Sequence, residues 1–279
     1  MQRSLLIGFF ALALASASAA GARCRVTAPT GESPPTRCNS FYHSGQAPAA
    51  VAATVPSTRI FCHMIYSVGY SGALLNPLWS AEHLTRAMAV CGDNINRLDK
   101  SFTQQPELRG TNLTVRDRDY QRGFDRGHMT PANDAPDDPS QADTFVFSNA
   151  VPQRGLFNRG LWSDLEAWVH RLAEAEGEVF IVTGPEFGPH PPLMTPRPGQ
   201  GRVPIPDSTF KAIFVPSLNL AVAFTSTNAD ASLCRIVTVA EITRRTGIDP
   251  FPALPAALKS QLPTTSLPQV SGARFPDCH

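Results

Sequence analysis

The chain has 279 residues, of which 42% are hydrophobic and 17% are charged, and its formal net charge is +1. This length is enough to bury a substantial core in one domain, or in two. The near-zero net charge excludes a protein that attracts polyanions through an overall basic field, so such a partner would have to meet a local patch. The 26 prolines, close to twice the average share, predict many rigid loops.

The first twenty residues have the pattern of a signal peptide. Arg3 precedes an apolar run from Leu5 to Leu14, and small residues follow it in two Ala-Ser-Ala patterns. The run is shorter than the ~18 to 20 apolar residues that a membrane span needs, so we expect cleavage and not anchoring. We therefore predict a signal peptide at residues 1–20, a single domain at residues 21–279, and a periplasmic or secreted protein without a membrane partner.

All six cysteines follow the predicted cleavage site. An even number in an exported chain indicates disulfides, with buried free thiols as the alternative. Their spacing excludes a zinc site of the C-x₂₋₄-C type, and it does not choose among the pairings. The cysteines are Cys24, Cys38, Cys62, Cys91, Cys234 and Cys278.

The apolar patterns predict an α+β protein with a mostly antiparallel sheet. We expect strands at 58–70, 143–149 and 178–183, and a hairpin of 209–215 with 220–226. The proline- and glycine-rich stretch 185–207 reads either as an interdomain linker or as a surface loop. Because strand-like segments flank it on both sides, we interpret it as a long surface loop within one domain.

Two helices are predicted. The first runs from Asn158 to Glu176, because Leu161, Leu165, Trp168 and Leu172 form one apolar face and Gly177 follows as a stop signal. The second begins at Thr238, which has capping-box spacing to Glu241, and ends at Gly247.

The segment "FDRGHMTPAND", residues 124–134, gathers an unusual amount of titratable chemistry. His128 could serve as a general base near neutral pH, and we expect Gly127 before it to allow a backbone conformation that aims the imidazole. Arg126 offers a planar fork suited to phosphate oxygens. The plainer interpretation is a turn in which His128 caps the backbone and Arg126 pairs with Asp125.

In the first predicted helix, Asn158, Trp162, Glu166 and His170 are spaced by four and form a stripe distinct from the apolar face. An Asn oxygen at the helix start and a carboxylate two turns later would suffice for Mg²⁺, which keeps several waters. The plainer interpretation is that Asn158 is an N-cap and Glu166 belongs to a solvated face.

Taken together, the two segments resemble the DNA/RNA non-specific endonucleases, the ββα-metal family of bacterial extracellular and mitochondrial sugar-non-specific nucleases. "DRGH" (125–128) matches the family signature, and "SNAVPQ" (148–153) followed by "NRGLWSDLE" (158–166) matches its second block. The resemblance extends through "VTGP" (182–185), "IPDSTFKAIF" (205–214) and "CRIVTVAEITRRTG" (234–247). It implies a ββα-metal fold: a central, mostly antiparallel sheet flanked by helices and long loops.

The resemblance also implies roles for individual residues. His128 would be the general base that takes a proton from the attacking water, and Arg126 would stabilise the charge that develops on phosphorus. Asn158 would be the sole direct protein ligand of Mg²⁺, with Mn²⁺ as a substitute ion, and Glu166 would orient a water bound to that metal. The substrates would be DNA and RNA, cut internally with little sequence preference to leave 5′-phosphates.

Other positions match the family less closely. Asn149 and Gln153 would support the metal shell or the substrate. Arg97 is the best match to an upstream phosphate-binding arginine, although Arg116, Arg118 or Arg122 could fill that role. We assign Arg122 to substrate binding as part of this local basic cluster. Internal ion pairs with the interleaved aspartates are an equally good reading of the cluster.

Two positions depart from the family pattern, and one pair of cysteines matches it. His170 stands where some members have an arginine, which would alter a substrate contact. Asn133 stands where close bacterial relatives often have glycine, which would affect loop shape more than chemistry. The resemblance pairs Cys234 with Cys278.

Two other functions stay open at this point. One is a catalytically inactive nucleic-acid-binding module on the same fold, and the other is a phosphodiesterase for small-molecule esters. A monomer and a homodimer are equally compatible with the sequence.

Overall fold

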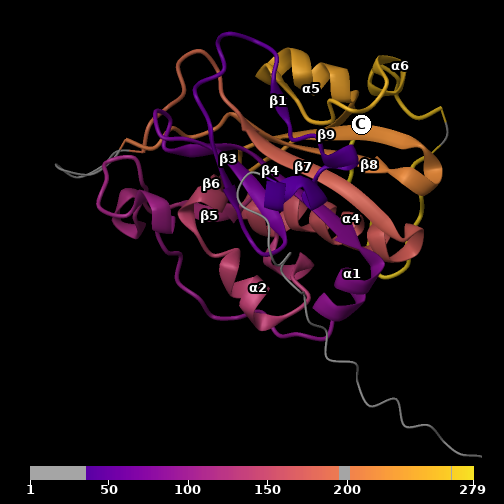
Figure 1. The fold of residues 1–279 in the computed structure, drawn as a ribbon, viewed down its shortest axis with the longest axis horizontal. Coiled ribbons are helices and arrows are strands. Elements are labelled where there is room, and N and C mark those ends of the chain that lie inside the picture. The colour runs from indigo at the N-terminus through magenta and orange to yellow at the C-terminus, as the bar shows by residue number, and fades with distance from the viewer. Residues whose placement is uncertain (1–35, 195–201, 265) are drawn as a thin grey trace, which may run out of the picture.

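A large antiparallel sheet forms the centre of the computed structural model, which describes residues 36–194, 202–264 and 266–279. The predicted signal peptide and Cys24 lie outside these ranges. Within them, seven strands lie in the order β10-β9-β8-β7-β4-β3-β2, and every neighbouring pair is antiparallel (Figure 1). The strands are β2 (Arg59–Cys62), β3 (Tyr66–Ser71), β4 (Asn76–Thr85), β7 (Glu178–Glu186), β8 (Ser208–Val215), β9 (Leu220–Thr227) and β10 (Cys234–Val237).

Helices cover both faces of this sheet (Figure 1). On one side lie α1 (Arg86–Gly92), α2 (Asp138–Asp143) and α4 (Ser163–Glu176), and on the other lie α5 (Val239–Thr246) and α6 (Ala256–Lys259). The apolar face of α4 packs on the sheet through Leu165, Trp168 and Leu172. On the opposite face, Val239 and Ile242 of α5 join a separate core cluster. The prediction of an α+β fold with a mostly antiparallel sheet flanked by helices is confirmed.

A smaller pair of strands lies beside the large sheet and leads into α4. Strand β5 (Phe124–His128) pairs antiparallel with β6 (Ala150–Arg154), and the chain continues through α3 (Gly155–Phe157) and a π-helical turn, η7 (Asn158–Trp162), into α4. Two strands followed by a helix are the ββα arrangement that the resemblance implies. A third pair joins β1 (Ala49–Ala50) to β11 (Ile248–Asp249). The remaining elements are short 3₁₀ turns: η1 (Thr36–Phe41), η2 (His43–Gly45), η3 (Pro106–Leu108), η4 (Asp117–Asp119), η5 (Ala132–Asp134), η6 (Phe147–Asn149) and η8 (Pro216–Leu218).

Two of the predicted strands differ from the structure. Segment 58–70 contains two strands, β2 and β3, which pair with each other across a tight turn. Segment 143–149 is not a strand and ends in the turn η6, because the backbone groups around Phe145 and Phe147 bond instead to Thr103 in a distant loop. The strand at 178–183 and the hairpin of 209–215 with 220–226 are confirmed, each with small shifts of its ends.

The predicted helix from Asn158 to Glu176 is present, but its first turn is π-helical. Gly160 interrupts the regular conformation there, and Gly177, with φ of 100°, ends the helix. The polar stripe is wrong in one respect, because Trp162 is fully buried in the core beneath α4. The second helix begins as predicted, since Thr238 accepts a hydrogen bond from the Glu241 backbone N–H at 3.0 Å.

The described ends of the proline-rich stretch 185–207 are held in place. Pro185 and Glu186 belong to β7, and the Met194 N–H donates to the Val203 carbonyl at 2.9 Å. Met194 and Val203 are also buried together in an apolar cluster. The stretch therefore packs on the domain at both ends, while residues 195–201 lie outside the described residues.

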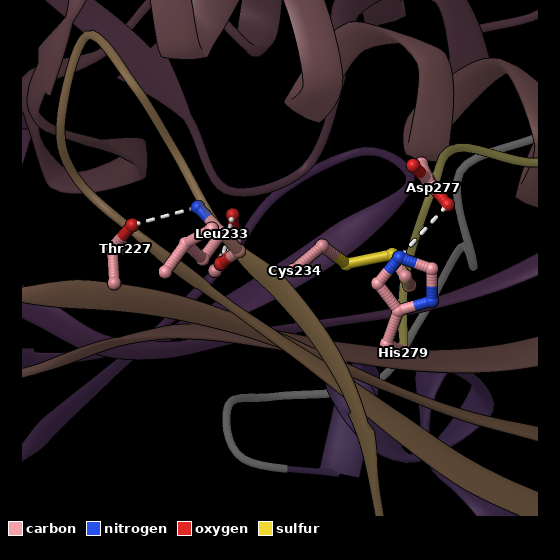
Figure 2. The surroundings of a disulfide bond; sticks show 7 residues. Thr227, Leu233, Cys234, Asp277 and His279 are labelled. Carbon is pink, nitrogen blue, oxygen red and sulfur yellow. Dashed lines mark hydrogen bonds and ion pairs between the residues drawn. A yellow bond between two sulfur atoms is a disulfide. The ribbon is translucent and has the colours of Figure 1, made fainter.

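Disulfides tie two segments to the sheet. Cys38 joins η1 to β2, through Cys62. Cys234 at the start of the edge strand β10 bonds to Cys278 near the end of the chain, the pair that the resemblance implies (Figure 2). An ion pair between Asp277 and His279 lies beside this bond (Figure 2). Cys91 is also disulfide-bonded.

Candidate active site

The β5–β6 pair presents His128. The last residue of β5, His128, pairs with Ala150, and Gly127 pairs with Val151. Our reason for Gly127 was wrong, because its backbone is ordinary extended strand and does not adopt positive φ. Glycine is needed there for space: a Cβ atom would lie 1.9 Å from Oε1 of Gln153.

His128 lies in an apolar pocket wall. Its side chain is 8% exposed, and its ring lies 4.8 Å from the ring of Phe102 and 4.9 Å from that of Phe145. The Nε2 atom is buried and has no hydrogen-bond partner among the described residues. Burial, together with the nearby Arg97 guanidinium, lowers the pKa of His128 to about 3. The imidazole is therefore neutral at pH 7, the form in which it can accept a proton.

Asn158 begins the π-helical turn, and its side chain is oriented by a carboxylate. Its Nδ2 donates to Oδ2 of Asp125 at 3.0 Å, and Arg159 contacts the other oxygen of Asp125 at 3.4 Å. Because Asp125 holds the amide nitrogen, the amide oxygen Oδ1 is left to accept or to bind a cation. π-Helical turns occur frequently at functional sites, since they alter the direction of one side chain within a helix.

Glu166 lies two turns further along the same helical segment. Its Oε1 is buried and has no hydrogen-bond partner among the described residues. Burial raises the pKa of Glu166 to about 7, although the Lys211 ammonium acts in the opposite direction. A carboxylate in such surroundings would be stabilised by a cation.

These side chains meet in one pocket of about 400 Å³, which we call the central pocket. The structure thus brings together five predicted site residues that are separated by up to 69 positions in the sequence. They are Arg97, Arg126, His128, Asn158 and Glu166. The pocket is lined by Arg97, Asp125, Arg126, His128, Pro131, Ala132, Asn133, Asn158, Arg159, Ser163 and Glu166.

Two of the candidate arginines line this pocket. Arg97 is exposed, and its guanidinium lies 5.4 Å from the centre of the Phe145 ring. Arg126 pairs with Asp117 at 2.5 Å and lies over the Tyr120 ring at 5.0 Å. The alternative pairing of Arg126 with Asp125 does not occur, because Asp125 bonds to Asn158 and Arg159.

The other basic candidates lie elsewhere. Arg122 is exposed in the turn before β5, and neither it nor Arg116 or Arg118 is among the described residues that line the central pocket. Of the four arginines considered for the upstream phosphate contact, Arg97 therefore has the position that suits the role.

Asn149 and Gln153 are buried behind the pocket and do not line it. The Asn149 side chain accepts from the Thr130 N–H at 2.9 Å and donates to the carbonyls of Thr130 and Thr144 at 3.0 and 3.1 Å. It thereby holds the loop that follows His128. Gln153 packs under Gly127, and its Nε2 donates to Oγ1 of Thr209 on β8 at 3.2 Å. In this structure both residues support the strands that carry His128.

Two features of the site were missed from the sequence. Asp125 was considered only as a partner of Arg126, whereas it orients Asn158. Lys211 is 1% exposed in the middle of β8, where its ammonium donates to Thr183 at 2.8 Å and lies 5.4 Å from the ring of Trp162. The signal for Lys211 was present, since a charge inside an otherwise apolar strand predicts a buried, partnered cation.

The residues present fit a hard cation such as Mg²⁺. Among the described residues, no group of three or more His, Cys, Asp or Glu side chains is placed to hold a metal. The available donors are the Asn158 amide oxygen and the buried, unpartnered Glu166 oxygen, and oxygen donors in small number are what Mg²⁺ uses in proteins. No helix among the described residues is long and apolar enough to cross a membrane.

Comparisons with known proteins show the family to which the chain is similar. The family model for DNA/RNA non-specific endonucleases matches residues 44–257. Nuclease C1 of Cunninghamella echinulata var. echinulata is 35% identical over 159 residues, which are 54% of this chain and 63% of that protein. The mitochondrial nuclease EXOG of Danio rerio is 30% identical over 235 residues, 78% of this chain and 67% of that protein.

A solved structure shares the fold. The similarity to a chain in the crystal structure of the EndoG/EndoGI complex has a TM-score of 0.58 and 26% identity, and it covers 68% of this chain and 84% of that one. The family model spans most of the sequence and includes every residue of the central pocket. The chain therefore belongs to the DNA/RNA non-specific endonuclease family.

Proposed function

We propose that this protein is a Mg²⁺-dependent endonuclease that hydrolyses phosphodiester bonds of DNA and RNA with little sequence preference. The observation that carries the proposal is the central pocket, in which a neutral buried histidine, an oriented asparagine, a carboxylate and two arginines converge. This is the set of groups that phosphodiester hydrolysis requires: a base, oxygen donors for a cation, and fixed positive charge.

His128 would act as the general base. Its low pKa means that it is unprotonated at neutral pH, and the Arg97 cation contributes to that low value. A bound phosphate would bring negative charge close to both groups, which favours the protonated imidazole and so strengthens the base when substrate is present. A positioned base of this kind contributes typically about 10²- to 10⁴-fold to the rate.

Asn158 would hold the metal through its amide oxygen, with Glu166 nearby to orient the metal's water shell. When bound there, Mg²⁺ or Mn²⁺ would supply positive charge that neutralises the leaving 3′-oxygen, which leaves 5′-phosphate products. Because the Asp125 carboxylate accepts from the amide nitrogen of Asn158, the amide oxygen of Asn158 points away from that carboxylate.

Arg126 and Arg97 would bind the phosphate and stabilise the charge that develops on it. Contacts to the sugar–phosphate backbone carry no direct sequence information, so a site built from them would cut with little sequence preference. The same contacts are available in DNA and in RNA.

We also propose that residues 1–20 are a signal peptide and that residues 21–279 form the mature nuclease domain in the periplasm or outside the cell. The disulfides Cys38–Cys62 and Cys234–Cys278 support this, since such bonds persist in oxidising compartments. N-terminal sequencing of the protein from cell fractions would test it, with a mature chain that begins near residue 21 as the expected result. An intact Met1 in a reducing compartment would contradict it.

The test of the activity is digestion of plasmid DNA and of a long RNA by the disulfide-intact protein, with Mg²⁺ and with EDTA. We expect the wild-type protein to cleave both substrates with Mg²⁺ and not with EDTA. We expect His128→Ala to retain less than about 1% of the wild-type rate, since it loses the general base. His190→Ala, at an exposed position outside the pocket, is the matched control and should cleave normally. A wild-type protein that retards nucleic acid in a gel without cutting it would contradict the proposal.

A further inference from the structure

His170 is a buried junction between three segments of the chain. It lies on α4 one turn after Glu166, and it is 7% exposed. Its Nδ1 is 2.7 Å from Oδ1 of Asp134 in η5, and its Nε2 is 3.2 Å from the carbonyl oxygen of Ala89 in α1. Oδ1 of Asp93, just after α1, lies 3.5 Å from the same Nε2.

These contacts determine the protonation of the ring. A carbonyl oxygen can only accept a hydrogen bond, so Nε2 must carry a proton to bond to Ala89. A carboxylate likewise only accepts, so Nδ1 must carry a proton to bond to Asp134. A neutral imidazole has one N–H, and it would leave one of these two acceptors unpaired. Both contacts are made together by the imidazolium.

The segments that meet at His170 are those that carry the catalytic groups. Asp134 follows His128 by six residues, in the loop that forms one wall of the central pocket, and α4 continues directly from Asn158. The end of α1 also fits closely against this loop, since a Cβ atom on Gly92 would lie 2.5 Å from the Asn133 carbonyl oxygen. A second pocket, of about 290 Å³, lies beside His170 and shares Glu166 and Asn133 with the central pocket.

We propose that His170, as an imidazolium, is a positioning residue that holds the His128 loop against the helix that carries Asn158 and Glu166. It acts through Asp134 and Ala89, and it does not line the central pocket. The inference rests on the proposed nuclease function. It also changes the meaning of the departure from the family pattern, because His170 is a cation turned into the fold and not a substrate contact.

The charged groups around His170 make this junction sensitive to pH. Burial lowers the pKa of His170, but the hydrogen bond and the charge of Asp134, with the charge of Asp93, outweigh both burial and the Arg171 guanidinium. The pKa in the folded protein is therefore raised above its ordinary value of about 6.5. A group of this kind contributes fully below its unfolded pKa, and the contribution is lost as the pH rises through its folded pKa. We therefore expect the junction at His170 to loosen as the pH rises.

The first test is the titration of His170 by ¹⁵N NMR of the folded protein with labelled histidines, compared with Asp134→Asn. We expect both ring nitrogens to be protonated at pH 7 in the wild type. We expect the variant to lower the pKa of His170 by about 1 unit or more, because it removes an adjacent opposite charge. The pH at which plasmid cleavage falls on the alkaline side should move down by the same amount.

Asp143→Asn is the matched control. It changes another His–Asp contact, between buried His63 and partly buried Asp143 at 3.1 Å, which lies outside both pockets. We expect it to leave unchanged the pH at which cleavage falls on the alkaline side (the alkaline limb), even if it lowers the melting temperature. His170→Arg is the second variant, because it keeps a cation that does not titrate below pH 12, and the adjoining pocket offers room for it. Its activity should persist at pH values where the wild type has lost it.

Different outcomes would overturn different statements. A neutral His170 at pH 7 would overturn the imidazolium and the proposal with it. So would a shifted His170 titration in Asp134→Asn without a shift of the alkaline limb. A wild-type protein that shows the NMR titration but no cleavage at any pH would contradict the proposed nuclease function instead.

Discussion

At the scale of single residues, burial shifts the two titratable groups of the pocket in opposite directions. The pKa of His128 is lowered to about 3 and that of Glu166 is raised to about 7. In both cases loss of solvation penalises the charged form of the side chain. Burial thus favours a neutral base beside a carboxyl group that a bound cation would ionise, which is the protonation pattern that metal-assisted hydrolysis needs.

Asp125 is the residue whose role is easiest to isolate. Asp125→Ala removes the acceptor that holds the Nδ2 atom of Asn158, so the amide oxygen loses its fixed direction. We expect the Mg²⁺ concentration for half-maximal cleavage to rise about 10- to 100-fold, the usual cost of removing a group that orients a ligand. Titration of plasmid cleavage with Mg²⁺ measures this.

The control for that experiment is Asp277→Ala, which removes a carboxylate that is 80% exposed and pairs with His279 beside the C-terminal disulfide. It should leave the Mg²⁺ requirement unchanged. An unchanged requirement in Asp125→Ala would mean that Asn158 is oriented by other contacts.

At the scale of elements, the β5–β6 pair depends on the absence of a side chain at Gly127. The space is filled by Gln153, which is fully buried and bonded to Thr209 of β8. The pair is thereby connected to the large sheet at the point where it presents His128.

We expect Gly127→Ala to lower the free energy of unfolding by about 1–3 kcal/mol, because the new methyl group overpacks a filled site. Urea denaturation followed by circular dichroism measures the change. The double variant Gly127→Ala, Gln153→Ala makes room for the methyl group, so its loss should be smaller than the sum of the two single losses. Additive losses would show that the close contact does not explain the glycine.

The π-helical turn η7 is the other element that shapes the site. Trp162 at its end is buried over the Lys211 ammonium, which in turn is bonded to Thr183 on β7. The turn that presents Asn158 therefore has contacts to the centre of the sheet. This explains why Trp162 lies in the core although its spacing placed it on the polar stripe.

At the scale of the whole molecule, the C-terminal segment covers α4. Trp168 donates to the Pro268 carbonyl at 3.2 Å, its ring contacts that of Phe275 at 4.9 Å, and Cys278 ties the segment to β10 (Figure 2). The disulfide closes a loop between cysteines 44 positions apart.

We expect the Cys234→Ser, Cys278→Ser variant to lose about 2–4 kcal/mol of stability, since the unfolded chain regains the entropy of the open loop. For a domain of this size that corresponds to a fall of several degrees in the melting temperature, which calorimetry measures. The residues that line the central pocket belong neither to β10 nor to the C-terminal segment. The cleavage rate well below the melting temperature should therefore be unchanged. A lost cleavage rate in a folded variant would show that the C-terminal segment shapes the pocket.

The fold could be predicted from the sequence where local patterns decide it. The helix at Asn158–Glu176, the hairpin of β8 with β9 and the cap at Thr238 follow from apolar periodicity and capping residues. Segment 143–149 was wrongly predicted because its apolar residues are buried around His128, while its backbone bonds to Thr103, which local sequence does not indicate.

For the site, the sequence by itself predicted the candidate residues, because the ordered blocks around His128 and Asn158 specify residue types at fixed spacing. It also predicted the helical segment that carries Asn158 and Glu166, and where that segment begins. The tertiary structure alone decided which candidates meet: Arg97 reaches the central pocket and Arg122 does not, while Asn149, Gln153 and His170 turn into the fold. The reason is physical. The partners that orient these side chains, such as Thr130, Thr209 and Asp134, come from other segments, and their contacts exist only once the sheet and α4 have packed.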